Sequence, residues 1–291
     1  MLGTRPGHGE DRRESRFAEL AGWRTVAVRG PAARRWLNDL VTADVQGLAD
    51  GRSRRSLLLT PTGRIRADLH VAAVNGSFLL LQGPGQPETV DAILAPYVLS
   101  SDVELIDRTD RSVIVAVLGG SAAADGDGGL TLAPSVLGSG HDVIVAPGES
   151  ARRLRERLLE RGSVEMTSAD LERWWIGNGI VRMGVDFGTD ALPAEAGLED
   201  AIDLTKGCFL GQESVAKVRN LGHPPRILLP VRSRRPIRPG DPVLADGETI
   251  GEVTSAAERA GETDAIVRVR WDAASRPLST DVGHLSLRRK G

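Results

Sequence analysis

The stretch from residue 193 to residue 223 reads PAEAGLEDAIDLTKGCFLGQESVAKVRNLGH and contains the only cysteine of the chain. Gly207 and Gly211 lie on either side of Cys208, so the backbone there can turn sharply or approach a ligand closely. Lys206 precedes the thiol by two residues, and a helix is predicted to follow it. Either the lysine or the positive end of that helix would favour the thiolate form of Cys208.

The single cysteine limits the chemistry of the chain. It excludes an internal disulfide and an iron–sulfur cluster held by four thiolates of this chain. One free thiol can still act as a nucleophile, a redox sensor or one ligand shared with a partner. The simpler interpretation is that Cys208 is a small, buried, apolar residue in a glycine turn.

Two polar residues follow the glycine turn. Gln212 and Glu213 lie at the predicted start of the helix, where the dipole favours a glutamate and where a glutamine can hydrogen-bond a ligand amide. The chain has three lysines, Lys206, Lys217 and Lys290, and two of them lie within ten residues of the thiol. This spacing favours a functional role for the segment.

Residues 206–213, KGCFLGQE, resemble the K-G-C-[FY]-x-G-Q-E signature of the YgfZ family, folate-binding relatives of the glycine-cleavage aminomethyltransferase. The resemblance extends from the strand near Trp23 to the C-terminal region. It implies an α+β, aminomethyltransferase-like folate-binding domain with mostly antiparallel sheets, followed by a small C-terminal β-barrel. It also implies that tetrahydrofolate or a one-carbon derivative is bound, and that Cys208 and Lys206 are catalytic residues beside the folate pocket.

The same resemblance implies partners. The family supports the assembly or repair of iron–sulfur proteins and is linked to tRNA thiomodification. We therefore expect folate and iron–sulfur proteins or their carriers as partners. The resemblance does not supply a reaction, so the sequence leaves open whether the protein is an enzyme.

A second segment bears on folate recognition. Residues 192–198, LPAEAGL, are similar to the P-x-E-A-G-L segment of the aminomethyltransferase, whose glutamate binds the pterin ring. The resemblance implies that Glu195 accepts two parallel hydrogen bonds from the amino-pyrimidinone edge of the pterin. Glu199 takes this role if the register differs, and the simpler interpretation of Glu195 is a solvent-facing loop charge.

A third segment offers an acidic residue. Residues 63–69, GRIRADL, resemble the G-G-x-x-D-D-L loop of the aminomethyltransferase, where an aspartate acts near the reactive nitrogens of folate. The first acidic position is Ala67 here, so only Asp68 carries the catalytic role over. The alternative is an edge-strand aspartate paired with Arg64 or Arg66.

Two departures from the aminomethyltransferase pattern favour the YgfZ branch. That enzyme usually has aspartate at the position of Cys208 and lysine at the position of Gln212. Both differences argue against aminomethyl transfer but leave folate binding intact. Arg182 and Arg226 are candidates for the glutamate tail of folate, because a guanidinium group binds a carboxylate in a forked geometry.

The remaining sequence predicts the elements around these segments. Period-two alternation and turn residues predict strands over 23–29, 56–60, 65–74, 78–82, 103–106 and 113–118. Helical spacing predicts helices over 30–40, 88–99 and 149–161. Thr167 with Asp170, or Ser168 alone, is a candidate cap for the helix that carries Trp174 and Trp175. Residues 119–140 are rich in small and polar residues, which predicts an exposed loop.

Helical periodicity is absent after about residue 225, where short strands alternate with PGD, DGE and GET turns. We therefore expect two domains: an α+β domain of two intertwined subdomains over residues 1–224 and a β-barrel over residues 225–291. The net charge of −2 gives no strong field for DNA or an anionic membrane. The five histidines show no metal-ligand spacing, no apolar run is long enough to span a bilayer, and the N-terminus lacks the apolar core of a signal peptide, so we expect a cytoplasmic protein without a metal site.

Three functions are consistent with these observations. The first is a folate-binding maintenance factor that uses Cys208. The second is a folate-dependent aminomethyltransferase in which Asp68 serves as the acid, base or electrostatic group. The third is a non-enzymatic adaptor for iron–sulfur carriers, since a shared fold does not guarantee a shared function.

Overall fold

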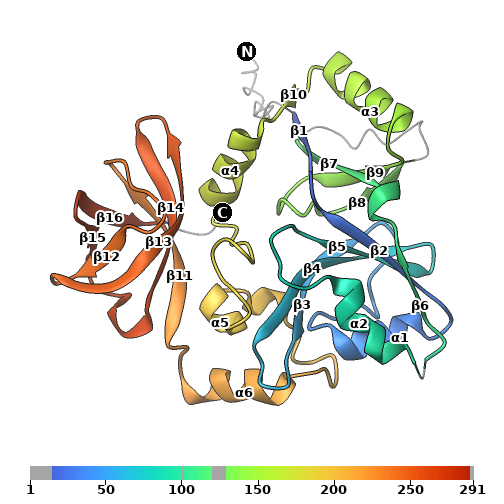
Figure 1. The fold of residues 1–291 in the computed structure, drawn as a ribbon, viewed down its shortest axis with the longest axis horizontal. Coiled ribbons are helices and arrows are strands. Elements are labelled where there is room, and N and C mark those ends of the chain that lie inside the picture. The colour runs from blue at the N-terminus through green and yellow to red at the C-terminus, as the bar shows by residue number, and fades with distance from the viewer. Residues whose placement is uncertain (1–14, 100, 120–128, 289–291) are drawn as a thin grey trace, which may run out of the picture.

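Two five-stranded sheets lie face to face, and a closed six-stranded barrel follows them in the chain (Figure 1). The computed structural model describes residues 15–99, 101–119 and 129–288. Within these residues, no helix is long and apolar enough to cross a membrane.

The first sheet is antiparallel and has the strand order β3-β4-β5-β2-β6. Its strands are β2 (Arg24–Arg29), β3 (Ser53–Leu59), β4 (Ile65–Val74), β5 (Ser77–Gln82) and β6 (Glu104–Asp107). Alternation along β4 directs Ala67, Leu69 and Val71 to one face. Two helices cover this face, α1 (Ala33–Leu40) and α2 (Val90–Val98), and contribute buried residues such as Leu37 and Leu94 to its core.

The second sheet has the order β10-β1-β7-β9-β8. Its strands are β1 (Arg16–Glu19), β7 (Val113–Leu118), β8 (Leu130–Leu132), β9 (His141–Val145) and β10 (Val164–Glu165). Helix α3 (Glu149–Glu160) covers its outer face through Leu154 and Leu158. The inner faces of the two sheets share one core, in which Ala27 and Leu79 meet Ile114 and Ile144. The layers are therefore helix, sheet, sheet and helix.

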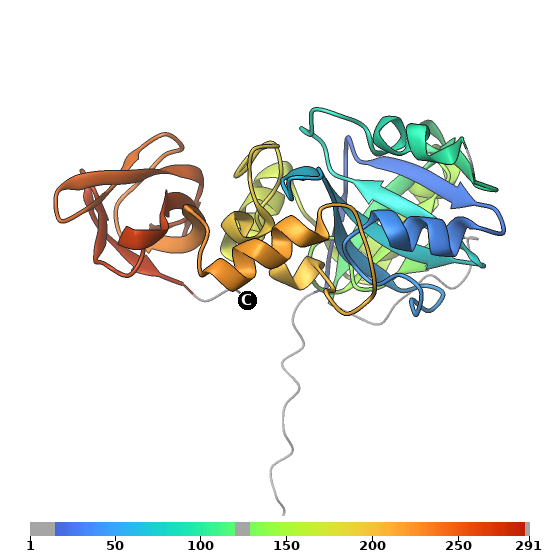
Figure 2. The same ribbon diagram turned by 90° about the horizontal axis from the view of Figure 1, so that it is seen from below.

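Three helices lie between the sheets and the barrel, α4 (Ser168–Gly177), α5 (Pro193–Ala196) and α6 (Gln212–Leu221) (Figure 2). The predicted cap of α4 is confirmed as a capping box: the amide of Asp170 donates to Thr167 Oγ1 at 3.2 Å, and the amide of Thr167 donates to the Asp170 carboxylate at 2.8 Å. Three 3₁₀ turns complete the elements, η1 (Thr109–Arg111), η2 (Glu199–Ala201) and η3 (Trp271–Ala273).

The barrel closes in the order β11-β14-β13-β12-β15-β16. Its strands are β11 (Arg226–Ser233), β12 (Pro242–Ala245), β13 (Glu248–Arg259), β14 (Glu262–Arg270), β15 (Leu278–Thr280) and β16 (Gly283–Leu287). The predicted fold class, α+β with a C-terminal β-barrel, is confirmed. The division into two domains after residue 224 remains a proposal. It is supported by the barrel's own core, which includes Val231, Val253 and Val267.

The expectation of an exposed loop over residues 119–140 is wrong in its second half. Strand β8 pairs with β9, and Val136 and Leu137 are buried in the core between the two sheets. The composition is misleading there because the small residues flank two short apolar pairs. Residues 120–128 lie outside the described part of the chain.

Candidate functional site

The predicted site residues occupy three separate places. Asp68 and Arg182 line a cleft of about 110 Å³ where β4 meets α4 and the loop after it. We name it the Asp68 cleft. Its walls include Trp23, Arg55, Asp68, His70, Trp175 and Arg182. The signature residues lie on the loop before α6, and Glu195 and Arg226 lie together elsewhere.

Asp68 is held in a two-pronged ion pair with Arg55 of the neighbouring strand. Arg55 Nε donates to Asp68 Oδ1 at 2.8 Å and its second nitrogen donates to Oδ2 at 2.5 Å. The same guanidinium also donates to the carbonyl of Val181 at 2.8 Å. The carboxylate is therefore fixed in position, and its remaining lone pairs can still accept hydrogen bonds from a ligand.

The alternative interpretation of Asp68 is wrong in both of its parts. Strand β4 has a neighbour on each side, so Asp68 does not lie on an edge strand. Arg66 pairs with Glu88 at 2.7 Å, and Arg64 donates to the carbonyl of Asp190. The register explains the actual pair, because Asp68 lies opposite Leu57, two residues beyond Arg55 on β3.

Aromatic rings form one wall of the Asp68 cleft. Trp23 and Trp175 stack with centroids 6.5 Å apart and planes 13° apart, and His70 lies 6.5 Å from Trp23. Burial lowers the pKa of His70 to about 4, the charge of Arg55 adds to this effect, and Asp68 opposes it. The imidazole is therefore neutral at pH 7, and its Nδ1 is buried without a hydrogen-bond partner among the described residues.

Arg182 lies over the ring of Trp175, with its guanidinium carbon 5.7 Å from the ring centroid. It forms two hydrogen bonds with Glu172, at 2.6 and 2.7 Å. Its Nε is buried and has no partner within the described chain. Arg182 therefore lines the cleft and carries one buried, unsatisfied donor.

Three residues of the signature loop make contacts that stabilise the fold. Lys206 Nζ donates to the carbonyls of Asn38, Val41 and Ala43 at the C-terminal end of α1. Burial lowers the pKa of Lys206 to about 8, opposed by Asp44 and other nearby carboxylates. Phe209 is buried in the core.

Gly211 has a φ of +83°, and a Cβ added there would lie 2.5 Å from the carbonyl oxygen of Thr60. Only glycine therefore lets the start of α6 dock on the turn between β3 and β4.

Cys208 is exposed, so the interpretation as a buried apolar residue is wrong. Gln212 is half-buried and Glu213 is exposed in the first turn of α6. None of these three residues lines the Asp68 cleft. Among the described residues, no three His, Cys, Asp or Glu side chains come together as a metal site.

Glu195 and Arg226 line a cavity of only about 20 Å³. Glu195 accepts a hydrogen bond at 2.7 Å from the amide of Leu192, the residue that caps its own helix α5. The folate role of Glu195 stays a prediction, and its observed contact stabilises the helix start.

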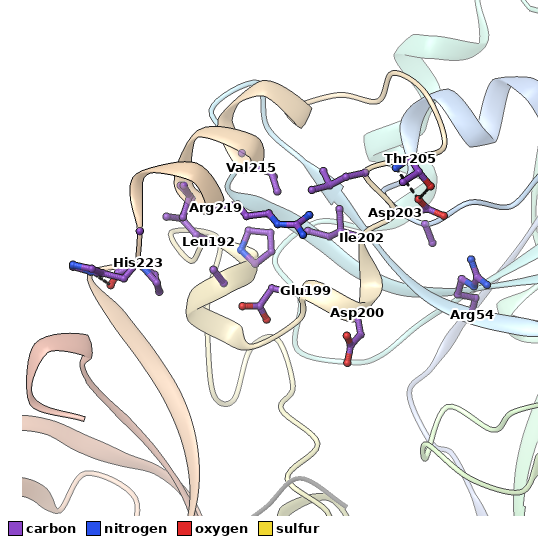
Figure 3. A pocket seen from close by; sticks show the side chains of 18 residues that line it. Arg54, Leu192, Glu199, Asp200, Ile202, Asp203, Thr205, Val215, Arg219 and His223 are labelled. Atoms are coloured by element: carbon purple, nitrogen blue, oxygen red, sulfur yellow. Dashed lines mark hydrogen bonds between the residues drawn. The ribbon is translucent and has the colours of Figure 1, made fainter. Parts of the chain in front are cut away.

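A larger cavity, of about 790 Å³, lies between α5, η2 and α6. Figure 3 shows Arg219 extending from α6 across this cavity towards Ile202, with Glu199 on the wall below it. Asp203 accepts hydrogen bonds from the amide and hydroxyl of Thr205 at 2.8 and 2.6 Å. Glu199, the alternative pterin ligand, thus lies in a different cavity from Asp68.

Arg55 and His70 are the cleft residues that the sequence did not single out. Both belong to predicted strands, and they lie directly opposite each other in the β3–β4 register. Aligning the two predicted strands as a hairpin would have paired these residues. Two residues that lie opposite each other in neighbouring strands have their side chains on the same face of the sheet.

Comparison with known proteins finds a family match and relatives of low sequence identity. Residues 8–124 match the GCVT N-terminal domain. This match, together with the relatives described next, supports a relationship of this chain to the glycine-cleavage T superfamily.

An aminomethyltransferase of Rubrobacter xylanophilus is 26% identical over 279 residues, which cover 87% of this chain and 75% of that protein. A chloroplastic protein of Arabidopsis thaliana, named as a transferase, is 24% identical over 267 residues, or 81% of this chain. The match spans 60% of the length of the Arabidopsis protein.

The structure of the glycine cleavage aminomethyltransferase T of Bartonella henselae has a similar fold. It superposes with a TM-score of 0.82 at 23% identity, covering 96% of this chain and 86% of that one. At this identity the likeness concerns the fold.

Proposed function

We propose that the protein binds tetrahydrofolate, with the pterin ring in the Asp68 cleft. The observation that carries this proposal is the fixed Asp68 carboxylate beside stacked indoles and a neutral imidazole. A carboxylate can accept hydrogen bonds from the amino-pyrimidinone edge, and the flat rings offer a surface for stacking. Proteins with the matched domain use tetrahydrofolate, which supports the same ligand.

Unpartnered buried atoms support the fit. His70 Nδ1 and Arg182 Nε are buried without hydrogen bonds to the described residues, and such groups are costly to leave unpaired. In this proposal they bind polar atoms of the ligand. Tetrahydrofolate supplies nitrogens that carry one-carbon groups, and Asp68 fixes the orientation of the pterin by holding its opposite edge.

We further propose that the protein supports iron–sulfur proteins through Cys208, in the cytoplasm. The thiol is exposed on a loop whose neighbours Lys206, Phe209 and Gly211 are engaged in packing. An exposed thiol outside the cleft favours an encounter with a partner protein. The contacts of these neighbours fix the backbone around Cys208, so the thiol is presented to a partner in a defined position.

A second candidate is aminomethyl transfer, favoured by relatives that carry this name and by the placement of Asp68 in the cleft. Incubation with tetrahydrofolate and an aminomethylated lipoyl carrier protein separates the two. We expect no turnover, because Cys208 and Gln212 differ from the aminomethyltransferase pattern. Turnover that is lost in Asp68→Asn would establish the transferase.

The adaptor hypothesis has its own test. Binding of an iron–sulfur carrier protein is measured by pull-down with and without tetrahydrofolate. Binding that depends on Cys208 and responds to tetrahydrofolate supports the maintenance factor. Binding that is the same with and without tetrahydrofolate, and the same in the wild type and Cys208→Ala, supports a non-enzymatic adaptor.

Calorimetric titration of tetrahydrofolate under anaerobic conditions tests folate binding. We expect saturable binding by the wild type and by Cys208→Ala, and an affinity at least about tenfold weaker in Asp68→Asn and Arg182→Gln. Asp272→Asn, at an exposed carboxylate on the barrel, is the matched control.

Glu195→Ala serves as a competing arm of the titration. Loss of binding in Glu195→Ala with normal binding in Asp68→Asn would move the pterin out of the Asp68 cleft. No binding by the wild type would reject the folate proposal.

A further inference from the structure

A cavity of about 550 Å³ opens at the edge of the two packed sheets, between β2 and β5 on one side and β8 and β9 on the other. Three arginines line it: Arg29 at the end of β2, and Arg108 and Arg111 around η1. We name it the arginine cavity. It shares no lining residue with the Asp68 cleft, so it is independent of the proposed folate site.

The charged residues that line the arginine cavity are all positive. Among the described residues that line it, none is Asp or Glu. Arg29, Arg108 and Arg111 form no ion pair within the described chain, whereas other arginines at the surface, such as Arg66 and Arg155, pair with glutamates. Three guanidinium groups around one cavity repel each other unless an anion lies between them.

The nearby carboxylates do not neutralise the arginine cavity. Asp107 is bound by Arg24 at 2.7 Å and accepts hydrogen bonds from Thr109. Glu104 lies opposite Arg29 in the strand register, and Asp110 lies between Arg108 and Arg111 in η1. Both are outside the lining of the cavity, and neither pairs with an arginine of the described chain. The positive charge is therefore available to a ligand.

Arg108 shows the clearest sign of a missing partner. Its Nε is buried and has no hydrogen bond to the described residues. Its backbone is fixed, because its amide donates to the carbonyl of Thr25 at 2.8 Å and its carbonyl accepts from Arg111 at 2.9 Å. An arginine with a fixed backbone and an unsatisfied buried side-chain donor is suited to bind an oxyanion.

The other lining residues complete a site for a small molecule. Asn75, Ser77 and Ser112 offer neutral donors, and Phe78 and Ile144 offer apolar contact. The volume lies in the range of small-molecule pockets. We propose that the arginine cavity binds a small polyanion, a compound with two or more phosphate or carboxylate groups.

The test is calorimetric titration of the full chain with two probes, pyrophosphate and citrate, at low and moderate salt. We expect saturable one-to-one binding of at least one probe, weakened about tenfold in Arg108→Gln and in Arg111→Gln. Arg111 is exposed, so the second variant keeps the test valid if Arg108→Gln fails to fold. Arg153→Gln on the surface of α3 is the matched control and should bind as the wild type does.

The outcomes distinguish the sources of the anion. Binding of pyrophosphate alone indicates a phosphate compound, and binding of citrate alone indicates a polycarboxylate. Binding of neither probe, or equal weakening in Arg153→Gln, would overturn the proposal. Tetrahydrofolate binding should be unchanged in Arg108→Gln, which separates this site from the folate site.

Discussion

His70, Asp68 and Arg55 set the charge of the cleft. The Asp68–Arg55 pair is neutral as a whole, and the lowered pKa of His70 keeps the imidazole uncharged at pH 7. Arg182 is matched by Glu172. A polar cleft without net charge suits an uncharged heteroaromatic ring better than an anion.

The shifted pKa of His70 predicts a pH dependence of stability. The unfolded chain takes up a proton near the ordinary value of 6.5, whereas the folded chain does so only near pH 4. Stability from this residue is therefore fully present above pH 6.5 and is lost as the pH falls towards 4. Between pH 7 and pH 5 the loss amounts to about 2 kcal/mol.

Denaturant unfolding of the wild type and His70→Gln at both pH values measures this effect. The comparison is needed because burial raises the pKa of Asp142 to about 6, which acts in the opposite direction over part of the range. The variant should lose less stability than the wild type on going to pH 5. An equal loss in both proteins contradicts the assignment.

Lys206 is predicted to stabilise the fold. Replacing it in Lys206→Met removes the donor to three carbonyls at the end of α1, so the free energy of unfolding should fall by about 2–3 kcal/mol. The exposed Lys217 provides the control variant Lys217→Met, which should change stability by less than about 0.5 kcal/mol. Chemical denaturation measures both. Unchanged stability in Lys206→Met, with a changed rate of Cys208 alkylation, would favour the catalytic role instead.

At the residue scale the sequence identified an important segment but did not separate its roles. The motif KGCFLGQE was recognised as a unit. In the structure, Lys206, Phe209 and Gly211 serve the packing of the fold. The partners of Lys206 and Gly211 lie far away in the chain, at the end of α1 and on the β3–β4 turn. Spacing within the motif therefore could not reveal them.

The element that positions Cys208 is the start of α6. Ser214 donates to the carbonyl of Pro61 at 3.1 Å, and Gly211 lies against Thr60. These contacts join the loop to the β3–β4 turn, whose second strand carries Asp68. The thiol and the cleft are thus attached to one rigid hairpin.

Gly211→Ala tests this attachment. The added Cβ meets the Thr60 carbonyl and also forces an unfavourable φ, so we expect a loss of about 2–4 kcal/mol. Gly207→Ala is the matched control, since Gly207 has a φ of +103° but no neighbour within 4 Å of an added Cβ. Its cost should be only the backbone strain of about 1 kcal/mol. Equal losses in thermal or chemical unfolding would contradict the close docking of α6.

At the element scale the sequence predicted most strands and helices, because alternation and helical spacing are local signals. The strand over 65–74 and the helix at 149–160 are examples. It did not predict β8, whose three residues are too few to show a period. The register that pairs Arg55 with Asp68 depends on two strands together, so neither strand alone indicated it.

At the scale of the whole molecule, a buried carboxylate, Asp186, joins the barrel to the loop after α4. Asp186 accepts hydrogen bonds from Thr254 at 2.8 Å and Ser255 at 2.7 Å on the barrel. Its other oxygen accepts from the amide of Arg182 at 2.9 Å. The barrel thus helps to place Arg182 at the cleft.

Asp186→Ala should therefore reduce both stability and folate affinity. Three donors lose their acceptor, one of them the buried hydroxyl of Ser255, so the free energy of unfolding should fall by about 3 kcal/mol. Calorimetric and unfolding measurements check both effects, with the exposed Asp272→Ala as control. Normal stability in Asp186→Ala would show that the barrel is held by its apolar contacts alone.

The sequence predicted the barrel and the α+β class, but not how the candidate residues gather. Glu195 and Asp68 come from segments that resemble folate sites, yet they line different cavities. Their separation depends on how α5 packs between the sheets and the barrel. Nothing in either local segment encodes that packing.

A crystal structure of the protein with tetrahydrofolate, prepared without oxygen, tests the central claim most directly. We predict that the pterin lies against Trp23 and Trp175, with its amino-pyrimidinone edge hydrogen-bonded to Asp68 and a polar atom within reach of His70 Nδ1. A pterin in the cavity lined by Glu199 and Arg219, with the Asp68 cleft filled only by water, would contradict it.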